Sequence, residues 1–249
     1  MLFPRYNIFG LILIFLTFKF IYAELKAKPQ AVFLSLLSIL FIAPSVDSFW
    51  TMNNYTYTHR NYYGIYKVYE KEGARFLMNG TTLHGAQYIS DKKQMEPLTY
   101  YHRLTPVGKL MESKIFNFHN IGVVGLGAGT LAAYGKRGQV IDFFELDPDV
   151  FYIADKYFTY LKKSPAKINY IFGDARLALN KNSNSKYDLL VIDAFSGDSV
   201  PIHLLTTEAI SEYRDHLTKN GVILFHVSNR YLNLVPVLFS NAKVLNTYA

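Results

Sequence analysis

The sequence predicts an α/β protein in which a parallel sheet follows a small antiparallel β-meander and two apolar N-terminal segments. Three observations lead to this fold class. After residue 110, apolar strand-like segments alternate with helix-like segments. Residues 49–90 alternate polar residues with aromatic or β-branched ones. The first 48 residues contain two long apolar stretches. A chain of 249 residues is long enough for one large domain with appendages.

The two apolar stretches are the first elements along the chain. Residues 6–23 are apolar except for Lys19, and residues 29–46 contain no charge. Each is near the lower limit for a transmembrane helix, roughly 17 residues. We therefore expect residues 1–48 to form a membrane segment with two apolar helices. An alternative is that residues 1–23 are a signal peptide that ends at Ala23.

A small β-meander domain is expected over residues 49–110. The alternation of polar with aromatic or β-branched residues is typical of strands that are buried on one face. Lys71-Glu72-Gly73 and Asn79-Gly80 supply turns between such strands. Pro97 and Pro106 then interrupt regular structure, which predicts a loop and the start of a helix over residues 91–110.

The parallel sheet is expected within residues 111–249. Its strands are almost continuously apolar, which indicates a sheet covered by helices on both faces. Ligands of such sheets bind beyond the carboxyl ends of the strands. The chain ends soon after the fifth predicted strand, so this domain is expected to be truncated at its C-terminus. The strands are predicted at residues 121–125, 140–145, 167–172, 187–193 and 221–227, and the helices at residues 129–136, 148–162, 175–180 and 203–218.

Composition excludes several functions. There is no cysteine, so disulfides, thiolate metal sites and a cysteine nucleophile are excluded. The net charge is +7, but lysines and arginines are scattered and form no nucleic-acid-binding module, so no nucleic-acid partner is expected. The histidines lack the paired spacing of a metal site, and we expect no metal.

The glycine turn and the acids at the strand ends predict the ligand. Gly125, Gly127 and Gly129 follow the first strand in a GxGxG pattern, where the absence of Cβ atoms lets a ligand approach the backbone. Glu145 and Asp193 end later strands, and Asp174 follows another within two residues. Carboxylates gathered at one crevice repel one another unless the ligand offers hydroxyls and a positive charge. S-adenosylmethionine and its decarboxylated form meet both conditions, and the GxGxG spacing disfavours a dinucleotide.

At this point the sequence resembles the spermidine synthase family, the aminopropyltransferases. It is closest to the membrane-associated, transporter-fused members of that family. The resemblance runs from about Arg60 to Val237. It implies a Rossmann-like, methyltransferase-type sheet behind a β-meander, in agreement with the patterns above. It is carried by the segments RNYYGIYKVYE, FLMNGTTLHGAQYI, EPLTYYHRLTPVG, VVGLGAGTLAAYG, FFELDP, FGDAR, DLLVIDAFSGDSVPIHLLTTEA and LFHVSNRYLNLVPV.

The resemblance implies transfer of an aminopropyl group from decarboxylated S-adenosylmethionine to an amine such as putrescine. Asp193 matches the acid that accepts the proton of the attacking amine. Co-substrate binding is implied for the three glycines of the turn, for the ribose-binding Glu145, and for Asp174 and Ala175 near the adenine. Substrate binding is implied for Tyr100, Gln87, Ser196 and Asp198.

Three departures from the family pattern weaken the case for putrescine. Ala128 stands where the family has an acid inside the glycine turn that pairs with the aminopropyl ammonium. Ser196 replaces a second acid, for which Asp198 could substitute, and Tyr100-Tyr101-His102 lacks the usual glutamate. Each lost charge-assisted contact contributes on the order of 1.5–3 kcal/mol.

Two other functions therefore stay open. One is an S-adenosylmethionine-dependent methyltransferase, and the other is a non-catalytic polyamine- or nucleoside-binding module of a membrane protein. For the leading function we expect a membrane localisation, multi-pass, with the catalytic domain in the cytoplasm. We also expect no tightly bound cofactor, a small-molecule amine and the membrane as partners, and a homodimer.

Overall fold

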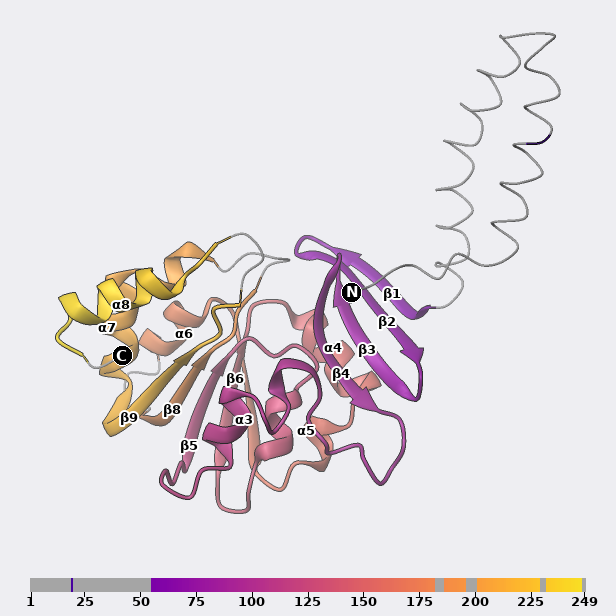
Figure 1. Cartoon of the computed structure of the whole chain (residues 1–249), viewed down its shortest axis with the longest axis horizontal. Helices are drawn as coiled ribbons and strands as arrows, with labels where there is room; N and C mark the ends of the chain where they lie inside the picture. Colours follow the sequence, from indigo (N-terminus) through magenta and orange to yellow (C-terminus); the bar gives the residue numbers. More distant parts are fainter. Residues whose placement is uncertain (1–18, 20–54, 182–185, 196–200, 229–231, 248–249) are drawn as a thin grey trace, which may run out of the picture. The chain divides into compact units, whose positions relative to one another are not determined.

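The computed structural model describes residue 19 and residues 55–181, 186–195, 201–228 and 232–247. The chain divides into two compact units, Met1–Asn54 and Tyr55–Ala249. Only Lys19 of the first unit is among the described residues. The second unit contains a four-stranded sheet and a five-stranded sheet with their helices (Figure 1). The expected domain boundaries, 48/49 and 110/111, stay predictions.

The predicted β-meander is present. Four antiparallel strands pair in chain order, and two-residue loops connect them. Glu72 and Gly73 both have positive φ, at 52° and 77°, as a tight hairpin turn with two left-handed residues requires. Gly80 has a φ of 58° in the next turn. The strands are β1 (Tyr55–Asn61), β2 (Gly64–Lys71), β3 (Ala74–Asn79) and β4 (Thr82–Tyr88).

The predicted parallel sheet is also present. Its strand order is β7-β6-β5-β8-β9, and every neighbouring pair is parallel. The order reverses between β5 and β8, which is where ligands bind in open sheets of this kind. The strands are β5 (Asn120–Val124), β6 (Val140–Glu145), β7 (Lys167–Phe172), β8 (Tyr187–Ile192) and β9 (Leu217–Phe225).

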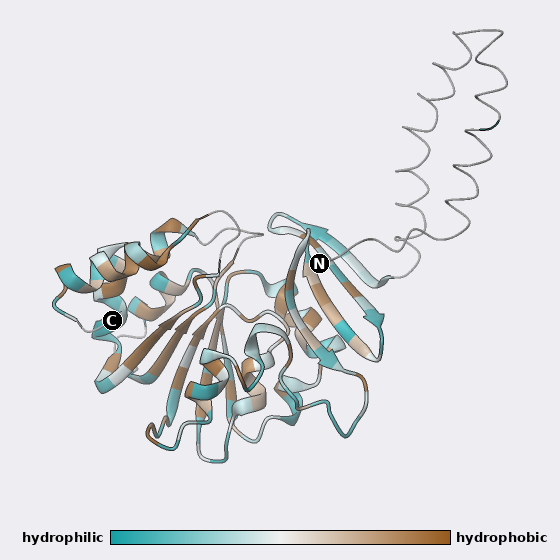
Figure 2. Cartoon of the chain, in the orientation of Figure 1, coloured by the Kyte–Doolittle hydropathy of each residue, from teal (hydrophilic) through white to brown (hydrophobic). Residues whose placement is uncertain are grey.

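Helices cover both faces of the parallel sheet and bury its apolar strands. Leu189 and Leu190 are adjacent in β8, point to opposite faces, and are both 0% exposed. Figure 2 shows the strands of this sheet as largely hydrophobic bands within the unit. The α-helices are α3 (Pro106–Met111), α4 (Pro148–Tyr157), α5 (Tyr160–Lys163), α6 (Ala175–Lys181), α7 (Thr207–Asp215) and α8 (Val235–Val244), and the 3-10 helices are η1 (Thr99–Tyr101), η2 (Thr130–Tyr134) and η3 (Ile202–Leu204).

The helix predicted over residues 148–162 is divided into α4 and α5. Phe158 ends α4 with an extended backbone and is buried at 1% exposure. The backbone N–H of Thr159 donates to the side-chain amide oxygen Oε1 of Gln87 at 3.0 Å. A residue of β4 therefore provides the hydrogen bond that a continuous helix would have provided. Tertiary contacts therefore interrupt a segment whose sequence is compatible with one helix.

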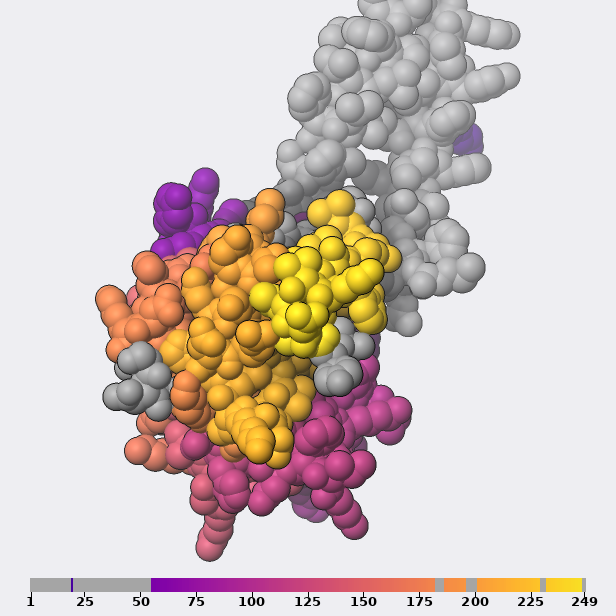
Figure 3. Space-filling model, turned by 90° about the vertical axis from the view of Figure 1, so that its left-hand side faces the viewer, coloured from indigo at the N-terminus to yellow at the C-terminus, as the bar shows by residue number. Residues whose placement is uncertain are grey.

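The helix predicted over residues 203–218 is shorter, and the last strand begins earlier than expected. α7 ends at Asp215 because the carbonyl of His216 accepts from the N–H of Tyr187 at 2.8 Å. From that point the chain pairs with β8 rather than with its own helix. In Figure 3 the yellow residues of α8 lie against the orange surface that α7 and β9 contribute.

The predicted localisation, a multi-pass membrane protein, is corrected. Among the described residues, no helix is long and apolar enough to cross a bilayer. The longest of these helices, α4 and α8, have 10 residues each, and such a helix spans about 15 Å, half of a hydrocarbon core of about 30 Å. Apart from Lys19, the apolar segments 6–23 and 29–46 lie outside the described residues.

Polar contacts between β1 and the start of α4 hold the meander against the parallel sheet. The amide nitrogen of Asn61 donates to Oδ2 of Asp147 and to Oδ2 of Asp149, both at 2.7 Å. Nε2 of His59 lies 2.9 Å from Oδ2 of Asp149. The bond from Asn61 and then the contact with His59 outweigh partial burial and lower the pKa of Asp149.

We expect Asn61→Ala to lower the free energy of unfolding by about 1–2 kcal/mol near neutral pH, because two hydrogen bonds to carboxylates are lost. The folded state lowers the pKa of Asp149, so this contribution is complete above the ordinary aspartate pKa of about 3.9 and is lost as the pH falls through the lower folded-state value. Urea denaturation between about pH 7 and about pH 3 measures the difference. Asn117→Ala, at an exposed residue that contacts His119, is the control. A loss that is equal at both pH values would contradict the assignment.

Candidate functional site

The glycine turn after β5 is clamped between the two sheets. Gly125, Gly127 and Gly129 all have positive φ, at 98°, 53° and 76°. A Cβ on Gly125 would lie 2.3 Å from the carbonyl oxygen of Asp193, and a Cβ on Gly127 would lie 2.5 Å from that of His84. The turn is therefore held by the end of β8 on one side and by β4 on the other. The helix predicted over residues 129–136 is shorter in the structure. Gly129 is followed only by the 3-10 helix η2, which has five residues.

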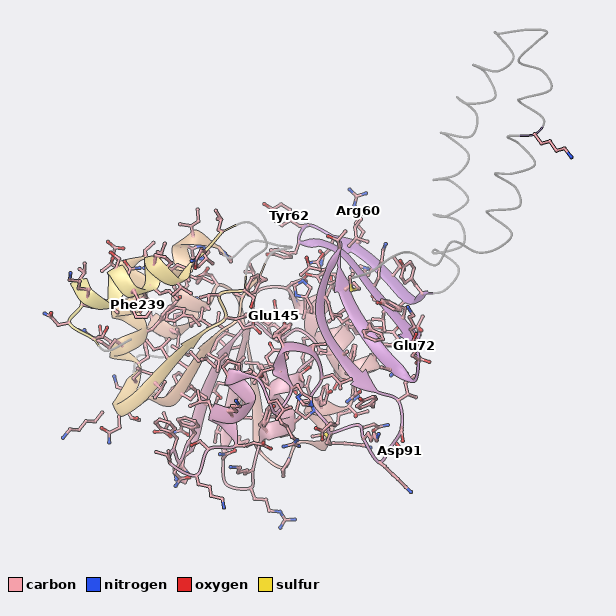
Figure 4. All side chains as sticks on the ribbon, in the orientation of Figure 1. Arg60, Tyr62, Glu72, Asp91, Glu145 and Phe239 are labelled. Atoms are coloured by element: carbon pink, nitrogen blue, oxygen red, sulfur yellow. The ribbon has the colours of Figure 1, made fainter. Side chains whose placement is uncertain are left out.

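Glu145 ends β6 beside this turn. Its Oε2 accepts the backbone N–H of Leu126 at 2.9 Å, and its Oε1 accepts that of Asp147 at 3.0 Å. Burial raises the pKa of this carboxyl group, and the backbone bonds oppose the rise. Figure 4 shows Glu145 between the parallel sheet and the meander. The carboxylate fixes the turn and keeps further lone pairs for a ligand.

Asp147 and Asp174 both receive backbone N–H groups at helix starts. Asp147 is the N-cap of α4 and accepts from the N–H of Asp149 at 2.9 Å. Oδ1 of Asp174 accepts from the N–H of Leu177 at 3.1 Å, at the start of α6. Oδ2 of Asp174 lies 3.1 Å from Nε2 of His203. Asp174 therefore combines a helix-capping contact with a position on the wall of a cavity.

A first cavity lies beyond the carboxyl ends of the parallel strands. Its wall combines the meander, the glycine turn and three strand ends. The residues include Tyr66, Asn79, His84, Gly125, Gly127, Glu145, Asp147, Asp174, Ala175, Asp193, Phe195 and His203.

Asp193 follows β8 and is a deeply buried acid of the site. Its side chain is 4% exposed. The hydroxyl of Tyr101 donates to Oδ2, and Nδ1 of His226 lies 2.5 Å from Oδ1. Burial raises the pKa of Asp193, and the contact with His226 offsets only part of that rise. Both oxygens of this buried carboxyl group are therefore engaged.

A second cavity meets the first at Asp193 and shares His84, Gly127 and Phe195 with it. Aromatic rings form much of its wall: the ring centroids of Tyr100 and Phe195 lie 4.5 Å and 4.7 Å from that of His226. Burial, and then the charge of Asp193, raise the pKa of Tyr100 well above its usual value. The second cavity is lined by Thr82, Leu83, His84, Tyr100, Tyr101, Gly127, Asp193, Phe195, His226 and Ser228.

The strand ends thus bring together most of the predicted site residues. Gly125, Gly127, Glu145, Asp174, Ala175 and Asp193 line the first cavity, and Tyr100 lines the second. Gln87 lines neither cavity, because its amide bonds Thr159 and the carbonyl of Gln94. Gly129 packs under Leu161. Ser196 and Asp198 lie outside the described residues.

Ala128 occupies a closed position at the centre of the glycine turn. Its side chain is 1% exposed and lines neither cavity. A Cβ on Gly85 would lie 2.5 Å from the Ala128 methyl group, so the backbone of β4 passes directly over it. The structure therefore has no space at this position for the acid that the predicted family carries.

Tyr101 and His226 belong to the site but were not among the predicted site residues. The sequence predicts the neighbouring Tyr100 as the substrate-binding residue. The available indication was position: His226 directly follows the fifth strand, as Asp193 follows the fourth. Within the described residues, no three histidine or acidic side chains converge as a metal site would require.

Thr99, which directly precedes Tyr100 and Tyr101, has a strained backbone. It has a φ of 62°, which a β-branched residue rarely adopts. Its buried hydroxyl oxygen has no hydrogen-bond partner in the described part of the chain. Tyr100 and Tyr101 follow immediately in η1. Such strain costs of order 1–3 kcal/mol and persists where the surrounding structure enforces it.

Comparison with known proteins supports the predicted resemblance, although no protein-family model matches the chain. The chain is 32% identical over 130 residues to a polyamine aminopropyltransferase of Vibrio vulnificus, a match covering 50% of this chain and 42% of the relative. It is 26% identical over 216 residues to a probable polyamine aminopropyl transferase of Bifidobacterium longum, covering 83% and 46%. The chain thus spans less than half the length of these two relatives.

A solved structure supports the fold. Spermidine synthase from Thermotoga maritima superposes with a TM-score of 0.56 at 15% identity, over 78% of this chain and 64% of that one. The two sequence relatives confirm the resemblance to the spermidine synthase family. The closer resemblance to membrane-associated members is not shown by these matches.

We expect Gly127→Ala to destabilise the protein more than Gly138→Ala. Both glycines have positive φ, 53° and 84°, so each substitution incurs a backbone cost of roughly 1–2 kcal/mol. Only the Cβ at residue 127 meets another atom, the His84 carbonyl oxygen at 2.5 Å, whereas a Cβ at residue 138 meets nothing within 4 Å. An additional loss of about 1–3 kcal/mol is therefore expected for Gly127→Ala. Chemical denaturation measures both values, and equal losses would show that β4 does not clamp the turn.

Proposed function

Starting from this similarity to polyamine aminopropyltransferases, we propose that the chain transfers an aminopropyl group from decarboxylated S-adenosylmethionine to an amine. One observation carries the proposal: two cavities beyond the strand ends share one buried carboxylate, Asp193. A transferase with two substrates needs such a junction, where donor and acceptor react out of bulk water. In this proposal the donor site belongs to the expected parallel-sheet domain, residues 111–249, and the expected β-meander domain, residues 49–110, covers it.

The first cavity suits the adenosyl part of the donor. Glu145 has lone pairs beyond those used by Leu126 and Asp147, and two ribose hydroxyls can donate to them. Asp174 and Ala175 stand at the next strand end, where we place the adenine. The cavity wall holds four carboxylates, which favours a ligand with a positive charge, such as a sulfonium.

The second cavity suits the acceptor amine. Aromatic faces attract ammonium groups, and Tyr100 and Phe195 provide such faces beside Asp193. The amine attacks the propyl methylene next to the sulfonium through its nitrogen lone pair. The carbon–sulfur bond breaks, its electrons go to sulfur, and methylthioadenosine leaves as a neutral thioether. The amine must lose a proton for this step, and acceptance of that proton depends on Asp193.

Ala128 favours one alternative reaction, methyl transfer from S-adenosylmethionine. The buried methyl group of Ala128 offers no partner for the ammonium of the aminopropyl group. In methyl transfer that part of the donor stays on the leaving product and does not need to be aligned for attack. The same two cavities would then bind S-adenosylmethionine and a methyl acceptor.

Donor binding tests the first cavity. We expect Glu145→Ala to weaken the binding of decarboxylated S-adenosylmethionine by roughly 10–100-fold, because hydrogen bonds to a charged carboxylate are lost. Isothermal titration calorimetry with each donor form measures the affinity. Glu70→Ala, which removes an exposed carboxylate paired with Arg75 on the meander, is the matched control. Equal affinity of the wild type and Glu145→Ala would reject this donor site.

Turnover tests the reaction. We expect wild-type protein to form methylthioadenosine and an aminopropylated amine, and Asp193→Asn to lower kcat by roughly 10²–10⁴-fold. Asp155→Asn, in an exposed pair with Lys162, should retain activity. Mass spectrometry of products from a panel of amines distinguishes the two reactions. A methylated product without an aminopropylated one would decide for the methyltransferase, and donor binding without any turnover would favour a binding module.

A further inference from the structure

The register of the parallel sheet places His226 beside the carboxylate of Asp193. β8 and β9 are parallel neighbours with Ile192 opposite Phe225, so the residues that follow them leave the sheet side by side. The N–H of His226 donates to the Ile192 carbonyl at 2.9 Å, which continues the pairing past the end of β9. Nδ1 of His226 then lies 2.5 Å from Oδ1 of Asp193.

This contact assigns the proton on the imidazole. When Asp193 is ionised its oxygens can only accept hydrogen bonds, so a neutral imidazole in this contact carries its proton on Nδ1 and its lone pair on Nε2. Among the described residues, Nε2 of His226 has no hydrogen-bond partner, and the side chain is 20% exposed on the wall of the second cavity. The nitrogen that can take up a proton is therefore on the residue that lines the acceptor cavity.

Asp193 is less available than His226 for the same task. Its side chain is only 4% exposed, compared with 20% for His226. Oδ1 is engaged by His226 and Oδ2 accepts the hydroxyl of Tyr101. An amine that approached the carboxylate directly would have to displace or share one of these two donors.

The ring of His226 is also held in place. Its centroid lies 4.5 Å from that of Tyr100 and 4.7 Å from that of Phe195. Among the described residues, the titratable groups that line the second cavity with His226 are Asp193 after β8, Tyr100 and Tyr101 from η1, and His84 from β4. Packing between two rings and a short bond to a carboxylate are the features that orient a histidine base.

We propose that Nε2 of His226 accepts the proton of the acceptor amine, and that Asp193 positions the imidazole and balances the charge it gains. The inference rests on the proposed function and names the proton route within it. The amine lone pair forms the new carbon–nitrogen bond as the carbon–sulfur bond breaks toward sulfur. The proton on nitrogen moves to Nε2, which leaves an imidazolium beside the Asp193 carboxylate until the proton passes to water. His226 is then the catalytic base, and Asp193 and Tyr101 are positioning residues.

The experiment compares His226→Gln with wild type in the full chain, using decarboxylated S-adenosylmethionine and the most reactive amine of the panel. We expect kcat to fall by roughly 10²–10⁴-fold, with donor affinity within about 3-fold of wild type. In a profile of kcat/KM against pH, the wild-type value should fall at low pH because the imidazole becomes protonated. This acid limb of the profile should be absent in His226→Gln. Added imidazole should restore part of the activity. His119→Gln, at a histidine before β5 that lines neither cavity, is the matched control.

A second measurement does not depend on turnover. Nitrogen NMR of histidine-labelled protein should show His226 protonated on Nδ1 alone above its own titration, and Asp193→Asn should change that tautomer. The assignment of the signal comes from its loss in His226→Gln. Protonation on Nε2 in the wild-type protein would overturn the inference.

The outcomes separate the inference from the proposed function. If the wild type makes methylthioadenosine and His226→Gln stays within about 3-fold of its kcat, or keeps the acid limb, the inference falls and the proposed function stands. If the wild type makes no product from any amine, both fall. A loss of kcat without imidazole rescue and with weakened donor binding would indicate a structural role, and would also overturn the inference.

Discussion

Two backbone hydrogen bonds beyond the strand ends determine the geometry of the site. The N–H of Asp193 donates to the carbonyl of Val124 at 2.8 Å, and the N–H of His226 donates to that of Ile192 at 2.9 Å. They extend the pairing of β5, β8 and β9 by one residue at the carboxyl edge of the sheet. The glycine turn, the buried carboxylate and the imidazole are adjacent because parallel register makes them so. A slip of one residue would turn each side chain to the other face.

The meander is a wall of the site as well as a cover. β4 crosses the glycine turn so closely that its backbone contacts the turn at Gly85 and at His84. This contact leaves a methyl group as the side chain that fits at residue 128. The bonds of His59 and Asn61 to the start of α4 hold the same sheet from its other side. The wall of the first cavity and the attachment of the meander are therefore two results of one interface.

Much of the fold follows from local patterns. The apolar runs that became β5 to β8 were long and almost uninterrupted, and burial on both faces of a parallel sheet requires such runs. The turn at Glu72-Gly73 needs two residues with positive φ, and its sequence indicates this. The break between α4 and α5 could not be predicted in the same way. It depends on a bond between Thr159 and Gln87, which are 72 residues apart.

Residues of the candidate site could be predicted where an acidic residue at the end of a strand was sufficient to place it on the cavity wall, as for Glu145 and Asp193. It was not predictable where the choice depended on side-chain direction. Tyr100 and Tyr101 are adjacent, and only the backbone of η1 determines which of them reaches Asp193. Gln87 is part of a segment that resembles the family, yet its amide is used to attach Thr159. The segments 6–23 and 29–46 illustrate another limit, because apolar composition alone led to a localisation that the described helices do not support.

The conformation of Thr99 has a consequence for how this protein can evolve. A glycine there would adopt the φ of 62° without a steric penalty and would also remove a buried hydroxyl that has no hydrogen-bond partner among the described residues. Selection for thermal stability alone would favour that change. Glycine would also give η1 more freedom, and the tyrosine hydroxyl that contacts Asp193 would be held less firmly. Persistence of threonine at this position would then mark selection for activity at the expense of stability.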